Sequence, residues 1–407
     1  MVYVLNKDGK PLMPTKRHGK VKHLLRSGKA IIVQRTPFTI QLAYGSTSYT
    51  QPITLGVDAG SKNIGLSATT EKKELYAAEV KLRTDIVDLI SARRNYRRTR
   101  RNRTTRYRQP RFNNRKRFDG WLAPSVQQKV DTHIKVIADV HKILPITKIV
   151  FENATFDIQK LKNPKIQGAE YQRGEQCGFW NVREYVIWRD NHKCQSPKCS
   201  GKDKVLRVHH IEDGGGDAPN NLITLCSTCN TLHHRGKVVL DFKRGDKYKD
   251  ATFMNVVRHA AYKELKKLYP TVEETFGHIT KNTRIALGLE KTHAVDAYCA
   301  TGNADAKMLD RWYLHKAVRH NNRQIHKATI SKGGYRKANQ APKYVFGYQL
   351  FDKVLCKGKV GFVFARRQSG SFAIRTLDGE RLTAGITYKK LKPLEKRRTI
   401  LTEIRDR

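Results

Sequence analysis

The stretch Ile53–Ser67, ITLGVDAGSKNIGLS, decides the fold. An apolar run leads to Asp58, a glycine-containing turn follows, and a second apolar run closes the stretch. Two apolar runs joined by a short turn with glycine are typical of a β-hairpin. The pattern predicts a hairpin whose first strand carries a carboxylate. A lone aspartate in a hairpin is usually a turn residue, so Asp58 gains weight only if partner carboxylates appear elsewhere.

A second carboxylate follows a predicted helix and strand. Apolar residues spaced by three and four over residues 125–144 predict an amphipathic helix that packs on a sheet. After Pro145 the run Ile146–Phe151 predicts a strand, which ends at Glu152. As with Asp58, the pattern predicts an apolar strand that carries a carboxylate, here at its end.

A third carboxylate lies far downstream. Residues Thr292–Ala300 have helical character, and His293 and Asp296 are one turn apart on the same face. Hydrolysis of a phosphodiester by two Mg²⁺ ions needs several carboxylates converging on metals roughly 3.5–4 Å apart. Asp58, Glu152 and Asp296 are the candidate ligands in this sequence.

An insert with adjacent histidines lies between the second and third carboxylates. It contains two close cysteine pairs around the histidine pair: Cys194 with Cys199, Cys226 with Cys229, and His209-His210. In a reducing compartment such cysteine pairs are typical of metal ligands rather than disulfides. Four thiolates can close a tetrahedral structural Zn²⁺ site, which a domain of roughly 50 residues needs as a staple.

Composition indicates the partner. The 407 residues contain 80 Lys and Arg against 36 Asp and Glu, a formal net charge of +44. Such a chain repels itself unless a polyanion neutralises it, and nucleic acid is the natural counterion. Ribosomal and chromatin proteins share this charge, so its sign alone does not define function. The length allows about two to four domains.

Membrane insertion and secretion are not expected. No apolar run approaches the roughly 18 residues of a membrane span. The start, MVYVLN, lacks a secretory pattern. We therefore expect an intracellular protein.

An arginine-rich segment, Arg93–Arg117, separates the first carboxylate from the second. About half of its residues are Arg, no acid interrupts it, and its first helix-breaking residue is Pro110. A basic helix of this kind needs phosphate on more than one side to be stable. A disordered basic loop is the alternative. The predicted nucleic-acid contacts are Arg93, Arg94, Arg97, Arg98, Arg100, Arg101, Arg103, Arg106, Arg108, Arg111 and Arg115.

The two ends of the chain predict small modules. Residues 1–50 suggest a small α+β module with the tetrapeptide PLMP at Pro11–Pro14, a basic helix over residues 17–26 and a strand over residues 30–34. The helix is as compatible with simple packing as with RNA contact. From about Tyr344 short apolar runs alternate with turns, which is typical of a small β-barrel.

The ordered carboxylates resemble the RuvC family of the RNase H fold. In that family the catalytic carboxylates are similarly dispersed over a hairpin strand, a later strand end and a helix. The resemblance implies that Asp58, Glu152 and Asp296 hold two Mg²⁺ ions. It also implies that His293 ligates a metal or positions the water, with simple packing as the alternative.

The insert resembles the HNH nuclease family, a ββα-metal motif. The resemblance implies that His210 is the general base, a role that suits an unperturbed pKa near 6.5. It implies that His209 ligates one Mg²⁺ and that Asn221 holds the loop bearing the base.

Asn230 and His234 complete the ligand set that the HNH resemblance implies. Asn230 stands where many members have His, and Asn favours Mg²⁺ over transition metals. His234, four residues on and on the same face, is the third implied ligand, with His233 left open in its place. A zinc knuckle that only binds nucleic acid is the alternative, but it does not require His209-His210 or Asn221.

The nested order, the arginine segment and PLMP together resemble RNA-guided nucleases of the CRISPR effector type, and among them the compact transposon-encoded IscB family. The implied fold is α/β (α+β multidomain): an RNase H-like RuvC core split by an Arg-rich bridge helix and an HNH insert, with a small C-terminal SH3-like β-barrel. The implied segments are 1–52 (PLMP), 53–90, 120–170 and 246–303 (RuvC-like), 91–119 (bridge helix), 171–245 (HNH with zinc), 304–345 (basic, RNA-contacting) and 346–407 (barrel).

The same resemblance implies a function. A structured ωRNA would guide the protein to double-stranded DNA with a short adjacent motif, which the barrel would read while base pairing reads the target. The HNH site would cut the guide-paired strand and the RuvC-like site the displaced strand. The chain would be a monomer in a ribonucleoprotein of the prokaryotic cytoplasm. The alternatives are a guide-independent resolvase or homing-type nuclease and a non-catalytic RNA-binding protein of a mobile element. The guide, the adjacent motif and the cut offset cannot be predicted from the sequence.

Overall fold

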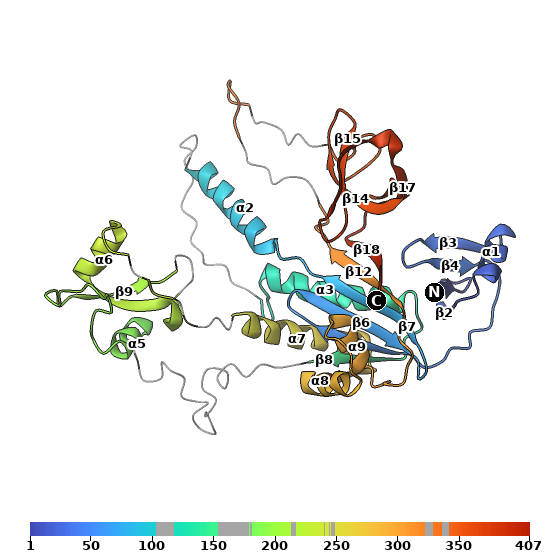
Figure 1. Ribbon diagram of the computed structural model, residues 1–407, viewed down its shortest axis with the longest axis horizontal. Coiled ribbons are helices and arrows are strands. Elements are labelled where there is room, and N and C mark those ends of the chain that lie inside the picture. Colours follow the sequence, from blue (N-terminus) through green and yellow to red (C-terminus); the bar gives the residue numbers. More distant parts are fainter. Residues whose placement is uncertain are drawn as a thin grey trace. The chain divides into compact units, whose positions relative to one another are not determined.

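The computed structural model describes residues 1–102, 118–153, 179, 181–212, 217–239, 241–243, 245, 249–321, 329–335 and 342–407, with the backbone alone for 249–252 (Figure 1). It divides into two compact units. The first comprises Met1–Ala154 and Met254–Arg407, and the second Thr155–Phe253. The insert with the cysteine pairs therefore forms a unit of its own.

A seven-stranded mixed sheet is the centre of the first unit. Its strands, in spatial order, are β11 (Val272–Thr275), β8 (Lys148–Glu152), β5 (Thr54–Ala59), β6 (Asn63–Thr69), β7 (Glu74–Lys81), β12 (Arg311–Ala317) and β18 (Ile400–Asp406). The predicted hairpin is β5–β6, and β7 continues it in antiparallel pairing. β8 lies beside β5 in parallel, and β11 lies parallel to β8.

Burial explains why these runs form central strands. Leu55, Val57, Ile64, Leu66 and Ile149 have no exposed surface. Strands that are covered on both faces contain nearly continuous apolar residues, as these do. At the β18 edge of the sheet the pairing is antiparallel, between β12 and β18. The central strands are therefore the buried part of the sheet.

Helices from three parts of the chain belong to the same unit. They are α2 (Ile86–Arg101), α3 (Pro124–His141), α7 (Lys249–Leu268), α8 (Gly277–Ala286) and α9 (His293–Ala300). α3 matches the predicted helix, begins with Pro at its first turn and buries Val130, Val136, Ile137 and Val140. α2 buries none of its residues, as expected of a helix rich in arginine. No helix among the described residues is long and apolar enough to cross a membrane.

The N-terminal module is a four-stranded sheet with one helix. Its strands are ordered β2 (Pro11–Thr15), β1 (Val2–Leu5), β4 (Thr39–Leu42) and β3 (Ala30–Gln34), and its helix is α1 (His18–Arg26). The predicted helix and strand both agree with it. The Tyr3 hydroxyl donates to the Leu75 carbonyl oxygen at 3.0 Å, which ties the module to the large sheet.

The C-terminal region contains a five-stranded antiparallel sheet. Its order is β16 (Arg381–Thr387), β15 (Ser371–Arg375), β14 (Lys359–Arg366), β13 (Lys353–Cys356) and β17 (Lys392–Glu395), with a short 3-10 helix, η3 (Tyr388–Lys390). Closure into an SH3-like barrel stays a prediction. Two strands lie outside the segments expected for them. β12 is expected in the basic segment 304–345 and β18 in the barrel 346–407, but the two strands pair with each other in the large sheet.

The second unit has a ββα core. Its elements are α5 (Val182–Arg189), β9 (Leu206–His210), the 3-10 turn η2 (Pro219–Asn221), β10 (Leu222–Cys226) and α6 (Ser227–His234). β9 and β10 pair antiparallel, with His209 opposite Ile223. The helix α6 follows β10 directly, so the predicted histidines and the second cysteine pair are brought into one small region.

Candidate functional site

The parallel pairing of β5 with β8 places Asp58 opposite Glu152. Directly opposed residues of neighbouring strands point to the same face, about 4.8 Å apart across the ladder. Asp58 is 6% exposed and Glu152 is 7% exposed. The structure therefore brings the first two predicted carboxylates together in a nearly buried position.

The helix α9 brings the predicted histidine and the third carboxylate to the same place. His293 is its first residue, and a nitrogen of its ring, Nδ1, lies 2.6 Å from Asp58 Oδ2. Glu79, on β7, accepts a hydrogen bond from the His293 backbone N–H at 2.9 Å. A carboxylate at a helix N-terminus is favourable because the helix dipole is positive there. The start of α9 is thus fixed by two carboxylates of the sheet.

Two glycines allow α9 to lie directly on the sheet. A Cβ atom at Gly65, on β6, would lie 1.8 Å from the His293 carbonyl oxygen. A Cβ atom at Gly56, on β5, would lie 1.9 Å from the Ala297 carbonyl oxygen. Both neighbours are backbone atoms, which cannot move without moving the helix. Only glycine permits the close approach that places His293 against Asp58.

Burial and the neighbouring charge of Asp58 shift the pKa values of the groups around it. Burial, and then the charge of Asp58, raise the pKa of Glu152 to about 7, although a hydrogen bond from Thr280 opposes the shift. Burial and Asp58 also raise the pKa of Asp296. The hydrogen bond with Asp58 raises the pKa of His293. Each shift is that expected of carboxylates forced together in a dry site.

Three further side chains, which the sequence patterns did not indicate, stabilise the carboxylates. Thr280 Oγ1, on α8, donates to Glu152 Oε2 at 3.1 Å. Arg284 Nε lies 3.1 Å from Asp296 Oδ1. Arg258, on α7, is 6% exposed and donates from Nε to the Ala59 carbonyl oxygen at 2.8 Å. None of the three stands in a pattern that predicts a site, because each reaches it from a distant helix.

Three carboxylates gathered at one edge of the sheet are oxygen donors of the kind that hard divalent cations prefer. Burial, and then the charge of Asp58, raise the pKa of Glu152, and a nearby divalent cation would favour its charged form instead. That Asp58, Glu152 and Asp296 hold Mg²⁺ stays a prediction. The number of ions stays a prediction.

The second unit brings its own histidines together. The His209 ring, on β9, lies edge-on to the rings of His233 and His234 of α6, with centroids 4.9 Å and 5.1 Å away. Asn230 lies on α6 one turn before His234. The predicted ligands His209 and His234 are thus neighbours, as is His233. Their ligand roles, and that of Asn230, stay predictions.

The candidate base has an orienting partner. One ring nitrogen of His210, Nε2, lies 2.8 Å from Asp217 Oδ1. A carboxylate can only accept, so Nε2 carries the hydrogen in the neutral ring, and Nδ1 is left to take a proton. Asp217 is not among the predicted site residues. The signal that could have indicated it is its place seven residues after His210, across a glycine run.

Asn221 holds the segment after His210. It is fully buried, its Oδ1 accepts from the Glu212 backbone N–H at 3.0 Å, and its Nδ2 donates to the Glu212 carbonyl oxygen at 3.2 Å. The backbone N–H of Ile211 donates to the Asn221 carbonyl oxygen at 2.8 Å. These bonds are what the predicted loop-holding role requires.

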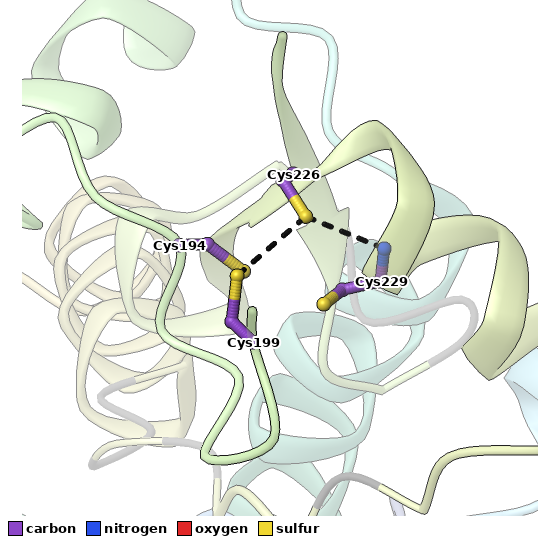
Figure 2. A group of neighbouring side chains, drawn as sticks. All are labelled: Cys194, Cys199, Cys226 and Cys229. Carbon is purple, nitrogen blue, oxygen red and sulfur yellow. Dashed lines mark hydrogen bonds between the residues drawn. The ribbon is translucent and has the colours of Figure 1, made fainter. Parts of the chain in front are cut away.

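The four predicted cysteines form one cluster, shown in Figure 2. Their sulfur atoms all lie within 4.8 Å of one another, and Cys199 Sγ lies 3.8 Å from Cys226 Sγ. A tetrahedron of sulfurs with Zn–S bonds near 2.3 Å has edges of about 3.8 Å. The thiols therefore fit a zinc ion, and this is the one group of potential metal ligands so close together within the described ranges.

The arginine segment is described in part. Arg93, Arg94, Arg97, Arg98, Arg100 and Arg101 lie on α2. Arg103, Arg106, Arg108, Arg111 and Arg115 lie outside the described residues. The predicted helix is therefore confirmed up to Arg101, and its nucleic-acid contacts stay predictions.

Comparison with known protein families gives two matches. Residues 2–174 match the RRXRR protein family, and residues 194–236 match the HNH endonuclease family. The second match spans the cysteine cluster and the histidine cluster. No curated protein matches the chain.

Among solved structures, two of Streptococcus thermophilus Cas9 are similar. The one in complex with the AGAA PAM is 15% identical, with a TM-score of 0.34, and covers 53% of this chain and 31% of its own. The one in complex with the GGAA PAM is 17% identical, with the same TM-score, and covers 54% and 32%. This chain thus spans about a third of those proteins.

The chain therefore combines a region similar to RRXRR proteins with a following segment similar to HNH endonucleases.

Replacing Gly65 tests whether direct packing of α9 on the sheet builds the carboxylate site. The added methyl group of Gly65→Ala meets the His293 carbonyl oxygen, so α9 must shift. A shift of about 1 Å in a catalytic group can cost about 100-fold in rate. We expect the nuclease activity that survives His210→Ala to fall by about that factor. Gly19→Ala is the control, because nothing lies within 4 Å of a Cβ there. Equal activity in both variants would contradict the account.

Replacing Cys226 tests the cysteine cluster. We expect Cys226→Ser to lose the metal and to unfold the second unit, since a structural zinc site contributes about 10–16 kcal/mol in small domains. Metal content per chain and limited proteolysis of the insert measure both effects. Cys356→Ser removes an equally buried thiol from the C-terminal sheet and should keep the metal. Unchanged metal content in Cys226→Ser would rule out the site.

Proposed function

We propose that this protein is an RNA-guided DNA endonuclease with two separate cutting sites. The observation that carries the proposal is the presence of two different catalytic constellations in one strongly basic chain. One is the carboxylate set around Asp58 and Glu152 in the first unit. The other is the histidine set around His209 and His210 in the second unit. Two sites of different chemistry suit the two strands of a duplex.

The topology supports an RNase H-like core for the carboxylate site. Three antiparallel strands, β5 to β7, are followed by β8 and β11, which add in parallel on the β5 side. We propose that this RuvC-like site cuts the displaced strand. Asp58, Glu152 and Asp296 would hold Mg²⁺, which stabilises the charge that develops on the attacking and leaving oxygens. His293 keeps Asp58 oriented through their hydrogen bond.

The histidine site is proposed to cut the guide-paired strand. His210 would take the proton of the attacking water on Nδ1, while Asp217 holds the ring by its other nitrogen. His209, Asn230 and His234 would hold one Mg²⁺. Asn221 keeps the segment after His210 in place through its hydrogen bonds with Glu212.

RNA guidance is proposed from charge and from the arginine helix. The +44 net charge needs a polyanion, and the arginine helix α2 follows β7 and lies, in chain order only, between the strands that bear Asp58 and Glu152. We propose that α2 grips the backbone of an ωRNA and its target duplex as a bridge helix. The C-terminal sheet would read a short motif beside the target. The complex would be a ribonucleoprotein with one protein chain, encoded by a mobile element and active in the prokaryotic cytoplasm.

Single substitutions separate the two sites. In a complex purified with RNA expressed from the flanking DNA, we expect Asp58→Ala to nick only the guide-paired strand and His210→Ala only the displaced strand. Strand-specific end labels on a matching duplex measure both cuts. Asp305→Ala, an exposed carboxylate outside both sites, should cut like wild type.

The other outcomes select the alternatives. Cutting without co-purified RNA would indicate a guide-independent nuclease. Bound RNA without any cut would indicate an RNA-binding protein. Loss of both cuts in either single variant would contradict the division of labour.

A further inference from the structure

An exposed aromatic pair lies at the sheet edge beside Glu152. β11 runs parallel to β8 with Thr275 opposite Glu152, so Phe276 is the first residue beyond that edge. The Phe276 side chain is 45% exposed. Its ring is parallel to that of His278, at an interplanar angle of 13° with centroids 6.0 Å apart. A single exposed aromatic residue is common, and here its position is what matters.

The helix α8, which begins directly after Phe276, contacts the carboxylate site. The Phe276 carbonyl oxygen accepts a hydrogen bond from the Thr280 backbone N–H at 3.3 Å, and the Thr280 hydroxyl donates to Glu152 Oε2 at 3.1 Å. Arg284, four residues further along α8, pairs with Asp296 at 3.1 Å. The backbone of Phe276 is therefore hydrogen-bonded directly to the residue that touches Glu152. Figure 1 shows α8 beside α9, which carries Asp296.

The charges around the pair suit a phosphate backbone. Lys281, on α8, and Lys291, in the segment between α8 and α9, are exposed. The nearest acid along the strand, Glu274, accepts a hydrogen bond from Asn153 at 3.3 Å, and Glu273 is paired with Lys148 at 2.7 Å. An aromatic face flanked by lysines combines the two features that bind single-stranded nucleic acid.

We propose that Phe276, backed by His278, is a stacking subsite for one nucleobase of the DNA strand that enters the carboxylate site. The inference rests on the proposed function and names a residue that would position its substrate. In a duplex the neighbouring base pairs cover both faces of each base, so an open face for Phe276 requires an unstacked base, as in single-stranded DNA. Stacking holds the strand equally before and during the reaction, so its loss raises KM and leaves kcat unchanged.

The experiment uses the RNA-loaded complex in a His210→Ala background, where only the carboxylate site cuts. The substrate is a target with a pre-opened displaced strand, in which 2-aminopurine replaces one base at a time. We expect Phe276→Ala and Phe276→Leu to raise KM about 10-fold, the range of one stacked base, with kcat within twofold. One 2-aminopurine position should be quenched by the wild-type side chain and not by either variant. Phe276→Trp should restore both KM and quenching.

Tyr49→Ala is the matched control, since Tyr49 is an aromatic residue that is 90% exposed in the linker before the sheet. It should leave KM and quenching unchanged. An unchanged KM in Phe276→Ala, a fall in kcat alone, or failure of Trp to rescue would overturn the inference. If the wild-type complex cuts no displaced strand, the proposed function fails. The quenching measurement then still decides whether Phe276 stacks a base.

Discussion

The parallel pairing of β5 with β8 is the constraint on which the rest of the structure depends. It sets Asp58 and Glu152 opposite each other in a dry position, where two like charges are costly. Side chains from three helices lower that cost. His293 bonds Asp58, Thr280 bonds Glu152, and the buried Arg258 is held by the end of β5. A divalent cation held by these carboxylates would lower that cost further.

Close approach of α9 follows from the same sheet. Gly56 and Gly65 remove the side chains that would hold the helix away, and Glu79 fixes its first residue. The helix can therefore present His293 and Asp296 at the edge where the strands end. Backbone packing, which is less adjustable than side-chain packing, thus determines the geometry of this site.

The second unit differs from the first in the size of its core. Its ββα core is small, and its four clustered cysteines could add the stability of a bound metal ion. The insert forms a compact unit of its own. The histidine cluster therefore lies in a different unit from the carboxylates, in agreement with the two separate sites that we propose.

Much of this arrangement could be predicted from the sequence, because apolar runs that end in a carboxylate and close cysteine pairs are local patterns. Asp58, Glu152 and the cysteine cluster are examples. Partners that reach the site from distant helices, such as Arg258, have no local pattern. Which strands pair with each other cannot be predicted from local patterns either. Short apolar runs from about Tyr344 predict a small barrel, but not that residues 400–406 pair with β12 in the large sheet.

Metal-directed backbone cleavage tests the central claim most directly. Fe²⁺ bound in place of Mg²⁺, with ascorbate and peroxide, cuts the chain only next to the ion. We expect backbone cuts near Asp58, near Glu152 and near His293–Asp296 in the same preparation. All three cuts should disappear in Asp58→Ala. Cuts at one of these segments alone, or cuts that survive Asp58→Ala, would contradict the convergence of the three carboxylates on one metal site.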